Sequence, residues 1–207
     1  MQSTLTPDAC PRPRVMSARW RQERADRRAW RRAESWPELC ELMADYVESL
    51  DPELPQDEVL ARTNRAGYLI HTAMPGGIEQ DGDSHRERRA AVFGFVFDMD
   101  LYGALARVAD VHGLTLLVRS VRDGDELGGQ AVERIDGVDG TEIGASKSVA
   151  TLHGEWGHLG PVGRGLLYAV RQVTLIDPMW GSNDRLWKAL GEAIDLYETQ
   201  PVGVHAF

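Results

Sequence analysis

The stretch that most constrains the fold covers residues 59–97, where helical, turn and strand patterns follow one another closely. It reads as the end of a helix, a glycine, an apolar segment, a Pro-Gly-Gly turn, a polar segment and a second apolar segment. Gly67 is suited to end the helix in a left-handed conformation. Residues 90–97 are almost continuously apolar, as in a strand buried on both faces. The stretch therefore predicts a mixed α and β domain.

Length and composition set the class of protein. The 207 residues suffice for one domain with a substantial core, and 43% hydrophobic and 27% charged residues are typical of globular chains. No apolar run approaches the ~20 residues of a membrane span, and the first residues lack a signal-peptide core, so we expect a cytoplasmic protein. The net charge of −9 disfavours binding to nucleic acid. Two cysteines exclude a disulfide framework.

The first 34 residues differ from the rest of the chain. Residues 1–15 show no periodicity and predict a flexible tail. Residues 16–34 predict a basic helical extension, with nine arginines between Arg12 and Arg32. We interpret these arginines as a solvated helical face rather than a nucleic-acid contact. Residues 35–207 are expected to form a single α+β domain.

The remaining elements follow from capping signals and periodicity. Ser35 and Glu38 form a capping box at the start of a helix whose apolar stripe extends to Leu50. Further helices are predicted at 55–65, from Asp98 or Asp100 to Gly113, at 165–171 and after residue 182. Strands are predicted at 68–72, 90–97, 114–121 and 172–176, with hairpins over 122–144, a polar loop over 78–87 and an irregular segment over 151–164. This order predicts an α+β fold of mixed or antiparallel sheets flanked by helices.

No catalytic signature is present in the sequence. The segment His153-Gly-Glu-Trp-Gly-His158 has two histidines, but its spacing is not that of HExxH and its glycines disfavour an aligned helix. We therefore predict no metal, and Trp156 is expected to pack or to act as a lid. Phosphate-binding glycine loops and the GxSxG nucleophile motif are also absent from the sequence. No cofactor is predicted from the residues themselves.

Three pieces of the chain resemble a known group of proteins. Residues 60–69 read LARTNRAGYL, residues 88–95 read RRAAVFGF, and residues 173–190 read VTLIDPMWGSNDRLWKAL. Each is similar to the matching part of an uncharacterised actinobacterial or actinophage family whose members carry a run like NRAGYLTTxSQPG. The three pieces occur in the same order as in that family, which predicts membership of it.

The same pieces resemble, more distantly, the regulatory domain of eukaryotic methylenetetrahydrofolate reductase. That domain binds S-adenosylmethionine as an allosteric inhibitor and performs no chemistry. The resemblance implies a non-catalytic domain that binds S-adenosylmethionine or a related nucleoside. This chain departs from the pattern, since Ile70 replaces a threonine and Ala73-Met74 replaces Ser-Gln. These changes remove hydrogen-bond partners, for which His71 and Thr72 could substitute.

The resemblance suggests a ligand site between the strand at 68–72, the turn at 75–77 and the strand that begins near Arg89. Alternation along the strand predicts that His71 and Thr72 face opposite surfaces of the sheet, with His71 toward the ligand. Arginines would contact an anionic group and tryptophans would supply a stacking face. The candidate ligand-binding residues are Asn64, His71, Thr72, Arg88, Arg89, Trp156 and Trp180.

Two other functions are left open by the sequence. The first is a protein-interaction module that acts through the Arg- and Trp-rich N-terminal helix, where Trp20, Trp30 and Trp36 lie close together in sequence. The second is an enzyme acting on a nucleoside-type substrate. The expected partners are therefore a small molecule or a protein, with a homo-oligomer left open.

Overall fold

The centre of the protein is a five-stranded antiparallel sheet in the order β1-β2-β5-β11-β6. A computed structural model describes residues 14–15, 27–49 and 56–199. The three inner strands are almost wholly buried, as expected for strands covered on both faces. The strands are β1 (Arg14–Val15), β2 (Tyr68–Met74), β5 (Ala91–Val96), β11 (Arg171–Ile176) and β6 (Thr115–Arg119).

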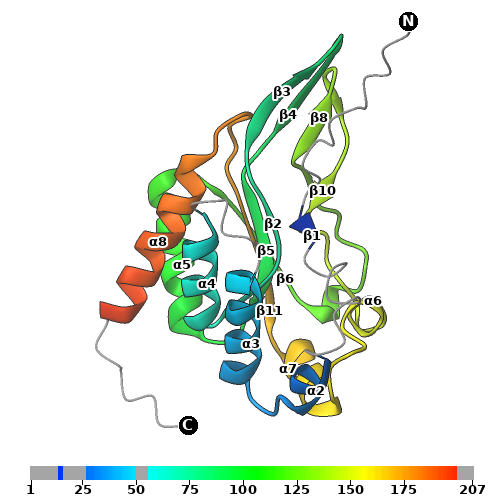
Figure 1. Ribbon diagram of the computed structural model, residues 1–207, viewed down its shortest axis with the longest axis vertical. Coiled ribbons are helices and arrows are strands. Elements are labelled where there is room, and N and C mark those ends of the chain that lie inside the picture. Colours follow the sequence, from blue (N-terminus) through cyan, green and yellow to red (C-terminus); the bar gives the residue numbers. More distant parts are fainter. Residues whose placement is uncertain (1–13, 16–26, 50–55, 200–207) are drawn as a thin grey trace, which may run out of the picture.

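Four helices cover one face of this sheet (Figure 1). They pack as the pairs α3 with α4 and α5 with α8. The first of them begins after Ser35 with one half of the predicted capping box: the Glu38 N–H points to the Ser35 hydroxyl, while the Glu38 carboxylate accepts from the Glu34 N–H, one residue before the expected Ser35 N–H. The four helices are α3 (Trp36–Ser49), α4 (Gln56–Arg65), α5 (Met99–His112) and α8 (Asp184–Thr199).

The opposite face is covered by shorter elements, which are visible on the right of Figure 1. A small strand pair joins β7 (Gln130–Ala131) to β10 (Glu142–Ile143), and α6 (Val149–Glu155) follows it. Two further helices, α2 (Arg27–Arg32) and α7 (Pro161–Ala169), lie at the lower end. A 3-10 turn, η1 (Val121–Asp123), follows β6. This thinner cover leaves room for a cavity against the sheet.

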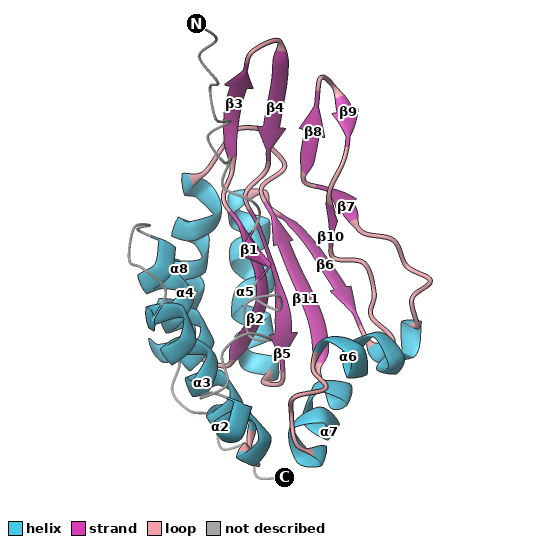
Figure 2. Cartoon of the chain, turned by 45° about the vertical axis from the view of Figure 1, so that its right-hand side comes forward, coloured by secondary structure: helices cyan, strands magenta, loops and turns pink. Residues whose placement is uncertain are grey.

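A second antiparallel sheet projects from one end of the molecule (Figure 2). It corrects the prediction of a polar loop over 78–87, because these residues form a hairpin that also pairs with β8. Backbone pairing, rather than burial, holds these polar residues in strands. The turn at Asp136-Gly137 joins the last two strands with both residues at positive φ, as a tight hairpin turn requires. The strands are β3 (Gly77–Asp81), β4 (Ser84–Arg88), β8 (Glu133–Ile135) and β9 (Val138–Asp139).

The predicted fold class is confirmed, and the helical N-terminal extension is seen as α2. Two boundaries differ from expectation. Arg14 and Val15, assigned to the tail, pair with β2, while residues 1–13 and 16–26 lie outside the described part. The segment 151–164, expected to be irregular, lies mostly in α6 and α7, because Ser148 caps one helix and Pro161 begins the other.

Candidate functional site

The site begins at a β-bulge in β2. Ile70 pairs with Gly94 and Thr72 pairs with Phe93, so His71 is an extra residue with no counterpart on β5. A bulge interrupts the alternation of side chains and turns two consecutive residues to the same face. The prediction that His71 and Thr72 face opposite surfaces is therefore wrong. Both side chains line one cavity, and the Nδ1 atom of His71 lies 2.8 Å from the Thr72 hydroxyl.

The chain after β10 crosses the same face of the sheet and brings Lys147 to it. The Gln172 amide, fully buried on β11, bonds the Lys147 N–H at 2.8 Å and the Lys147 carbonyl at 2.7 Å. Upstream, Gly144 has φ of +84° and packs so closely that a Cβ atom would lie 2.8 Å from the Thr174 hydroxyl. The segment is thus fixed to the sheet by its backbone, which leaves the Lys147 side chain to reach the cavity.

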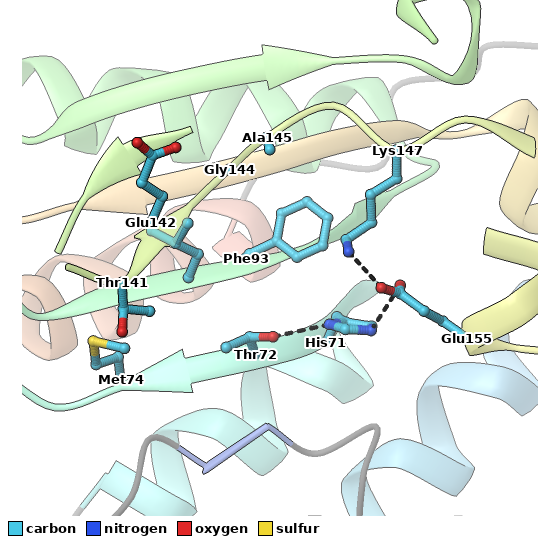
Figure 3. Close-up of a pocket in the computed structure, with 11 residues that line it drawn as sticks. His71, Thr72, Met74, Phe93, Thr141, Glu142, Gly144, Ala145, Lys147 and Glu155 are labelled. Atoms are coloured by element: carbon cyan, nitrogen blue, oxygen red, sulfur yellow. Dashed lines mark hydrogen bonds and ion pairs between the residues drawn. The ribbon is translucent and has the colours of Figure 1, made fainter. Parts of the chain in front are cut away.

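Helix α6 supplies the third charged or titratable group, Glu155. The Ser148 hydroxyl caps the helix by accepting from the Thr151 N–H at 3.2 Å. Asp125 fixes the same turn, since its carboxylate accepts from the Ser148 N–H at 2.8 Å and from the Thr151 hydroxyl at 2.9 Å. Glu155 is the last residue of this anchored helix and points back toward the sheet (Figure 3).

Four side chains form a continuous polar wall, the name used below for Thr72, His71, Glu155 and Lys147 together (Figure 3). The Lys147 ammonium donates to Glu155 Oε1 at 2.6 Å. The other carboxylate oxygen, Oε2, lies 3.3 Å from Nε2 of His71, in a contact whose alignment falls short of a good hydrogen bond. The order along the wall is hydroxyl, imidazole, carboxylate and ammonium, drawn from three separate segments of the chain.

Burial and the neighbouring groups set the charges of the polar wall. Burial lowers the pKa of His71 by more than the attraction of Glu155 raises it, and Lys147 lowers it further. Burial would raise the pKa of Glu155, but its contacts with His71 and Lys147 together bring that pKa down to about 2. Near neutral pH the wall therefore holds a neutral imidazole between a hydroxyl and an ion pair.

The cavity beside the polar wall has a volume of about 210 Å³. Its other described lining is largely apolar and includes Met74, Phe93 and Ile143. The Lys147 ammonium also lies 5.6 Å from the centre of the Phe93 ring. A polar edge facing an apolar floor is the usual composition of a small-molecule site.

Behind His71 lies a cluster of aromatic rings. The centre of the Trp156 ring is 5.5 Å from that of His71 and 5.8 Å from that of Phe95. Trp30 of α2 packs against Trp156 at 6.2 Å and against His158 at 5.8 Å. Trp156 is fully buried, so it supports the site from behind and does not form a lid.

Asn64, one of the predicted site residues, connects helix α4 to the sheet. Its amide oxygen accepts from the Ile70 N–H at 2.9 Å, and its amide nitrogen donates to the Leu60 carbonyl at 2.8 Å. Both bonds are buried within the protein. Asn64 thus orders the strand that carries the bulge and does not line the cavity.

Arg88, Arg89 and Trp180 lie together at the base of the second sheet, away from the cavity lining. Arg88 forms an ion pair with Glu79. The guanidinium carbon of Arg89 lies 4.1 Å from the centre of the Trp180 ring, and that of Arg134 lies 4.4 Å from it. These contacts hold the junction between the two sheets. The turn at 75–77 is closed as well, since a Cβ atom on Gly76 would lie 1.7 Å from the Ser182 carbonyl oxygen.

Lys147 and Glu155 are the functional candidates that sequence reasoning missed. Glu155 lies within the segment from His153 to His158, but its partners come from other parts of the chain and are not encoded in that segment. Lys147 belongs to no motif. Among the described residues, no group of three or more His, Cys, Asp or Glu side chains gathers as metal ligands.

Residues 25–196 match the family described as a domain of unknown function (DUF6919). The chain belongs to this family. No curated protein matches the chain. The match includes every element that builds the cavity, so the polar wall lies wholly inside the family's domain.

Two further observations bear on partners. No helix in the described ranges combines the length and the apolar character needed to cross a membrane. Trp30 and Trp36, considered as contacts of an interaction helix, are 3% and 7% exposed within the chain's own fold. The Trp36 indole N–H donates to the Gly67 carbonyl at 2.9 Å, so this ring is already bonded within the fold. Trp20 lies outside the described residues.

Proposed function

We propose that the protein binds a small molecule of nucleoside type in the cavity beside the polar wall. The observation that carries this proposal is the bulge in β2, which turns His71 and Thr72 together into a cavity that Lys147 and Glu155 complete. Bulges are common beside functional sites, where they redirect a side chain. A neutral, buried histidine with a perturbed pKa adds support, since such groups concentrate at functional sites.

The size of the cavity limits the ligand. A volume of about 210 Å³ is below the ~300–1,000 Å³ of sites for drug-sized molecules. One flat ring system fits this scale better than a complete S-adenosylmethionine, whose remaining groups would extend toward solvent. The apolar floor formed by Met74 and Phe93 favours the face of such a ring.

The charge of the cavity limits the ligand further. Among the described side chains that line it, Lys147 is the one cation, and its ammonium is already paired with Glu155. A phosphate group would have to share this ammonium with Glu155, whose carboxylate would repel it by its like charge. We therefore favour a nucleoside or a free base over a nucleotide.

A thermal-shift panel tests this proposal with adenosine, adenine, S-adenosylmethionine and adenosine monophosphate on the full chain. A bound ligand raises the melting temperature with concentration. Lys147→Met should abolish the shift, because it releases the Glu155 carboxylate into the cavity. Lys188→Met is the matched control, since Lys188 is exposed on α8. No shift with any compound on the wild type would overturn the proposal.

An enzyme acting on a nucleoside-type substrate is the second candidate, and the order of groups in the polar wall favours it. A hydroxyl, an imidazole and a carboxylate in sequence form the arrangement in which imidazole takes a proton from a hydroxyl. Incubation with adenosine followed by chromatography tests this candidate. New products that His71→Asn abolishes would support an enzyme. Unchanged adenosine would overturn this second candidate and would be compatible only with binding.

A further inference from the structure

The groups of the polar wall determine which atoms donate and which accept in its hydrogen bonds, and this determines which kind of ligand atom the wall can contact. The Lys147 ammonium can only donate, so Glu155 Oε1 accepts from it at 2.6 Å. The second carboxylate oxygen faces Nε2 of His71 at 3.3 Å. An ionised carboxylate has no proton to give, so the favourable arrangement puts the imidazole proton on Nε2.

A neutral imidazole carries one proton, and the other ring nitrogen is then an acceptor. With the proton on Nε2, the Nδ1 atom of His71 must accept. Its neighbour at 2.8 Å is the Thr72 hydroxyl, which therefore donates its one proton to Nδ1. Two observations support a neutral ring: the His71 side chain is only 4% exposed, and it packs between the rings of Phe93 and Trp156.

Once the Thr72 hydroxyl has donated its proton, only its lone pairs remain to face the cavity. We infer that Thr72 acts as an obligate hydrogen-bond acceptor toward the ligand, so that the site selects a flat ring bearing an N–H or O–H donor at its edge. The inference rests on the proposed function, because it specifies the ligand of the same cavity. An exocyclic amino group on a heteroaromatic ring has the required chemistry.

The other polar groups of the wall are less suited to accept a hydrogen bond from a ligand. Both nitrogens of His71 already face partners within the wall, and the Lys147 ammonium faces Glu155. The Lys147 ammonium has further N–H groups, but these can only donate, so the Thr72 hydroxyl is the uncharged acceptor that the wall offers to a ligand. The carboxylate and the ammonium act as positioning groups, since they set the tautomer of His71 and through it the polarity of the hydroxyl.

The first part of the test needs no ligand. Nitrogen-15 NMR of the full chain distinguishes the two tautomers of a neutral histidine, with His71→Asn used to assign the signals. The inference requires a protonated Nε2 and an unprotonated Nδ1 near neutral pH. A proton on Nδ1, or on both nitrogens, would overturn it and would leave the proposed ligand binding unaffected.

The second part uses two purines of matched shape, 9-methyladenine and 6,9-dimethylpurine, which differ by an amino group in place of a methyl group. Titration calorimetry on the wild type should show about three- to tenfold tighter binding of the amino compound, the value of one good hydrogen bond. Thr72→Val should bind both compounds equally, because it keeps the shape and removes the acceptor. Thr72→Ser should keep the preference.

The outcomes separate the two proposals. Equal binding of both purines to the wild type, or a preference that survives in Thr72→Val, would overturn the role of Thr72 while binding itself stands. If neither purine binds to the wild type, the nucleoside-type ligand is overturned and the role of Thr72 falls with it.

Discussion

The two faces of the central sheet differ in how closely they are packed. On the helix-covered face, Tyr68 crosses Gly94 and its hydroxyl donates to the Val173 carbonyl at 2.9 Å, so apolar packing and buried hydrogen bonds leave no space. On the opposite face, His71 and Thr72 border a cavity of about 210 Å³. The same strand, β2, serves both faces, and the bulge at His71 separates the two roles.

The residues that carry the family resemblance belong to the scaffold. Asn64 ties α4 to β2, and Gly67 ends the turn after α4 with φ of +109°. Asp177 is fully buried and accepts from the Met179 N–H and the Ser182 hydroxyl, which orders the loop before α8. These residues specify a fold, whereas all four residues of the polar wall lie outside the three resembling segments. Resemblance in the scaffold therefore gives weak guidance on the ligand.

The largest predicted effect comes from filling the packed face. A Cβ atom on Gly94 would lie 2.4 Å from the Leu69 carbonyl oxygen and 2.9 Å from the Ile70 Cα atom. Gly94→Ala should lower the free energy of unfolding by about 3 kcal/mol or more, because backbone atoms must move. Denaturant melts measure this change. Gly103→Ala is the control: it adds a methyl group in open space on α5 and should stabilise by about 0.5–1 kcal/mol.

The next effect comes from the buried amide of Asn64. Asn64→Ala removes two hydrogen bonds and leaves the Ile70 N–H without its partner, which should cost about 2–3 kcal/mol. Thr63→Val is a matched control on the same helix, since the Thr63 hydroxyl is buried with no hydrogen-bond partner among the described residues. This control should change stability by less than about 0.5 kcal/mol. Equal losses in both variants would show that Asn64 contributes through packing alone.

Acidification should weaken the cavity face specifically. The pKa of His71 is lowered in the folded state, so its neutral form contributes stability above about pH 6.5 that is lost as the pH falls. The pKa of Glu155 is lowered to about 2, so its contribution is present above about pH 4.5 and is lost below it. Together these groups should remove about 1–3 kcal/mol between pH 7 and pH 3.

Melting temperatures across this pH range, compared between the wild type and two variants, measure the effect. His71→Asn should flatten the upper part of the profile and Glu155→Gln the lower part. The side chains of His71 and Glu155 face each other, and the charged group beside them is Lys147. Because the two groups interact, the change in stability of the double variant should be smaller than the sum of the changes in the two single variants. Profiles identical to that of the wild type would contradict the assignment of charges.

The smallest effect on stability is expected at Thr72. Thr72→Val removes the hydroxyl at His71 Nδ1 but keeps the branched side chain, and the site borders a cavity. The free energy of unfolding should fall by about 1 kcal/mol or less. A loss as large as that of Asn64→Ala would show that the hydroxyl belongs to the scaffold and not to a binding site.

The sequence predicted the packed face better than the cavity face, for a physical reason. Capping at Ser35, the helix end at Gly67 and the buried strand at 90–97 are local patterns, and the structure contains the corresponding elements. The bulge at His71 depends on the spacing of its partner strand, which β2 alone does not encode. Lys147 reaches the cavity because Gln172, 25 residues away, bonds its backbone. No local sequence pattern predicts such a contact.

Titration calorimetry with adenosine on a cavity-blocking variant tests the central claim most directly. Ala145 lines the cavity at a solvent-exposed position, so Ala145→Trp should cover the opening of the cavity without removing any polar group. Ala150, an exposed residue on α6 outside the lining, supplies the matched control Ala150→Trp. The account predicts binding heat with the wild type and with Ala150→Trp, and none with Ala145→Trp. Equal heat from all three proteins would place the ligand elsewhere, and no heat from the wild type would contradict a nucleoside site on this face of the sheet.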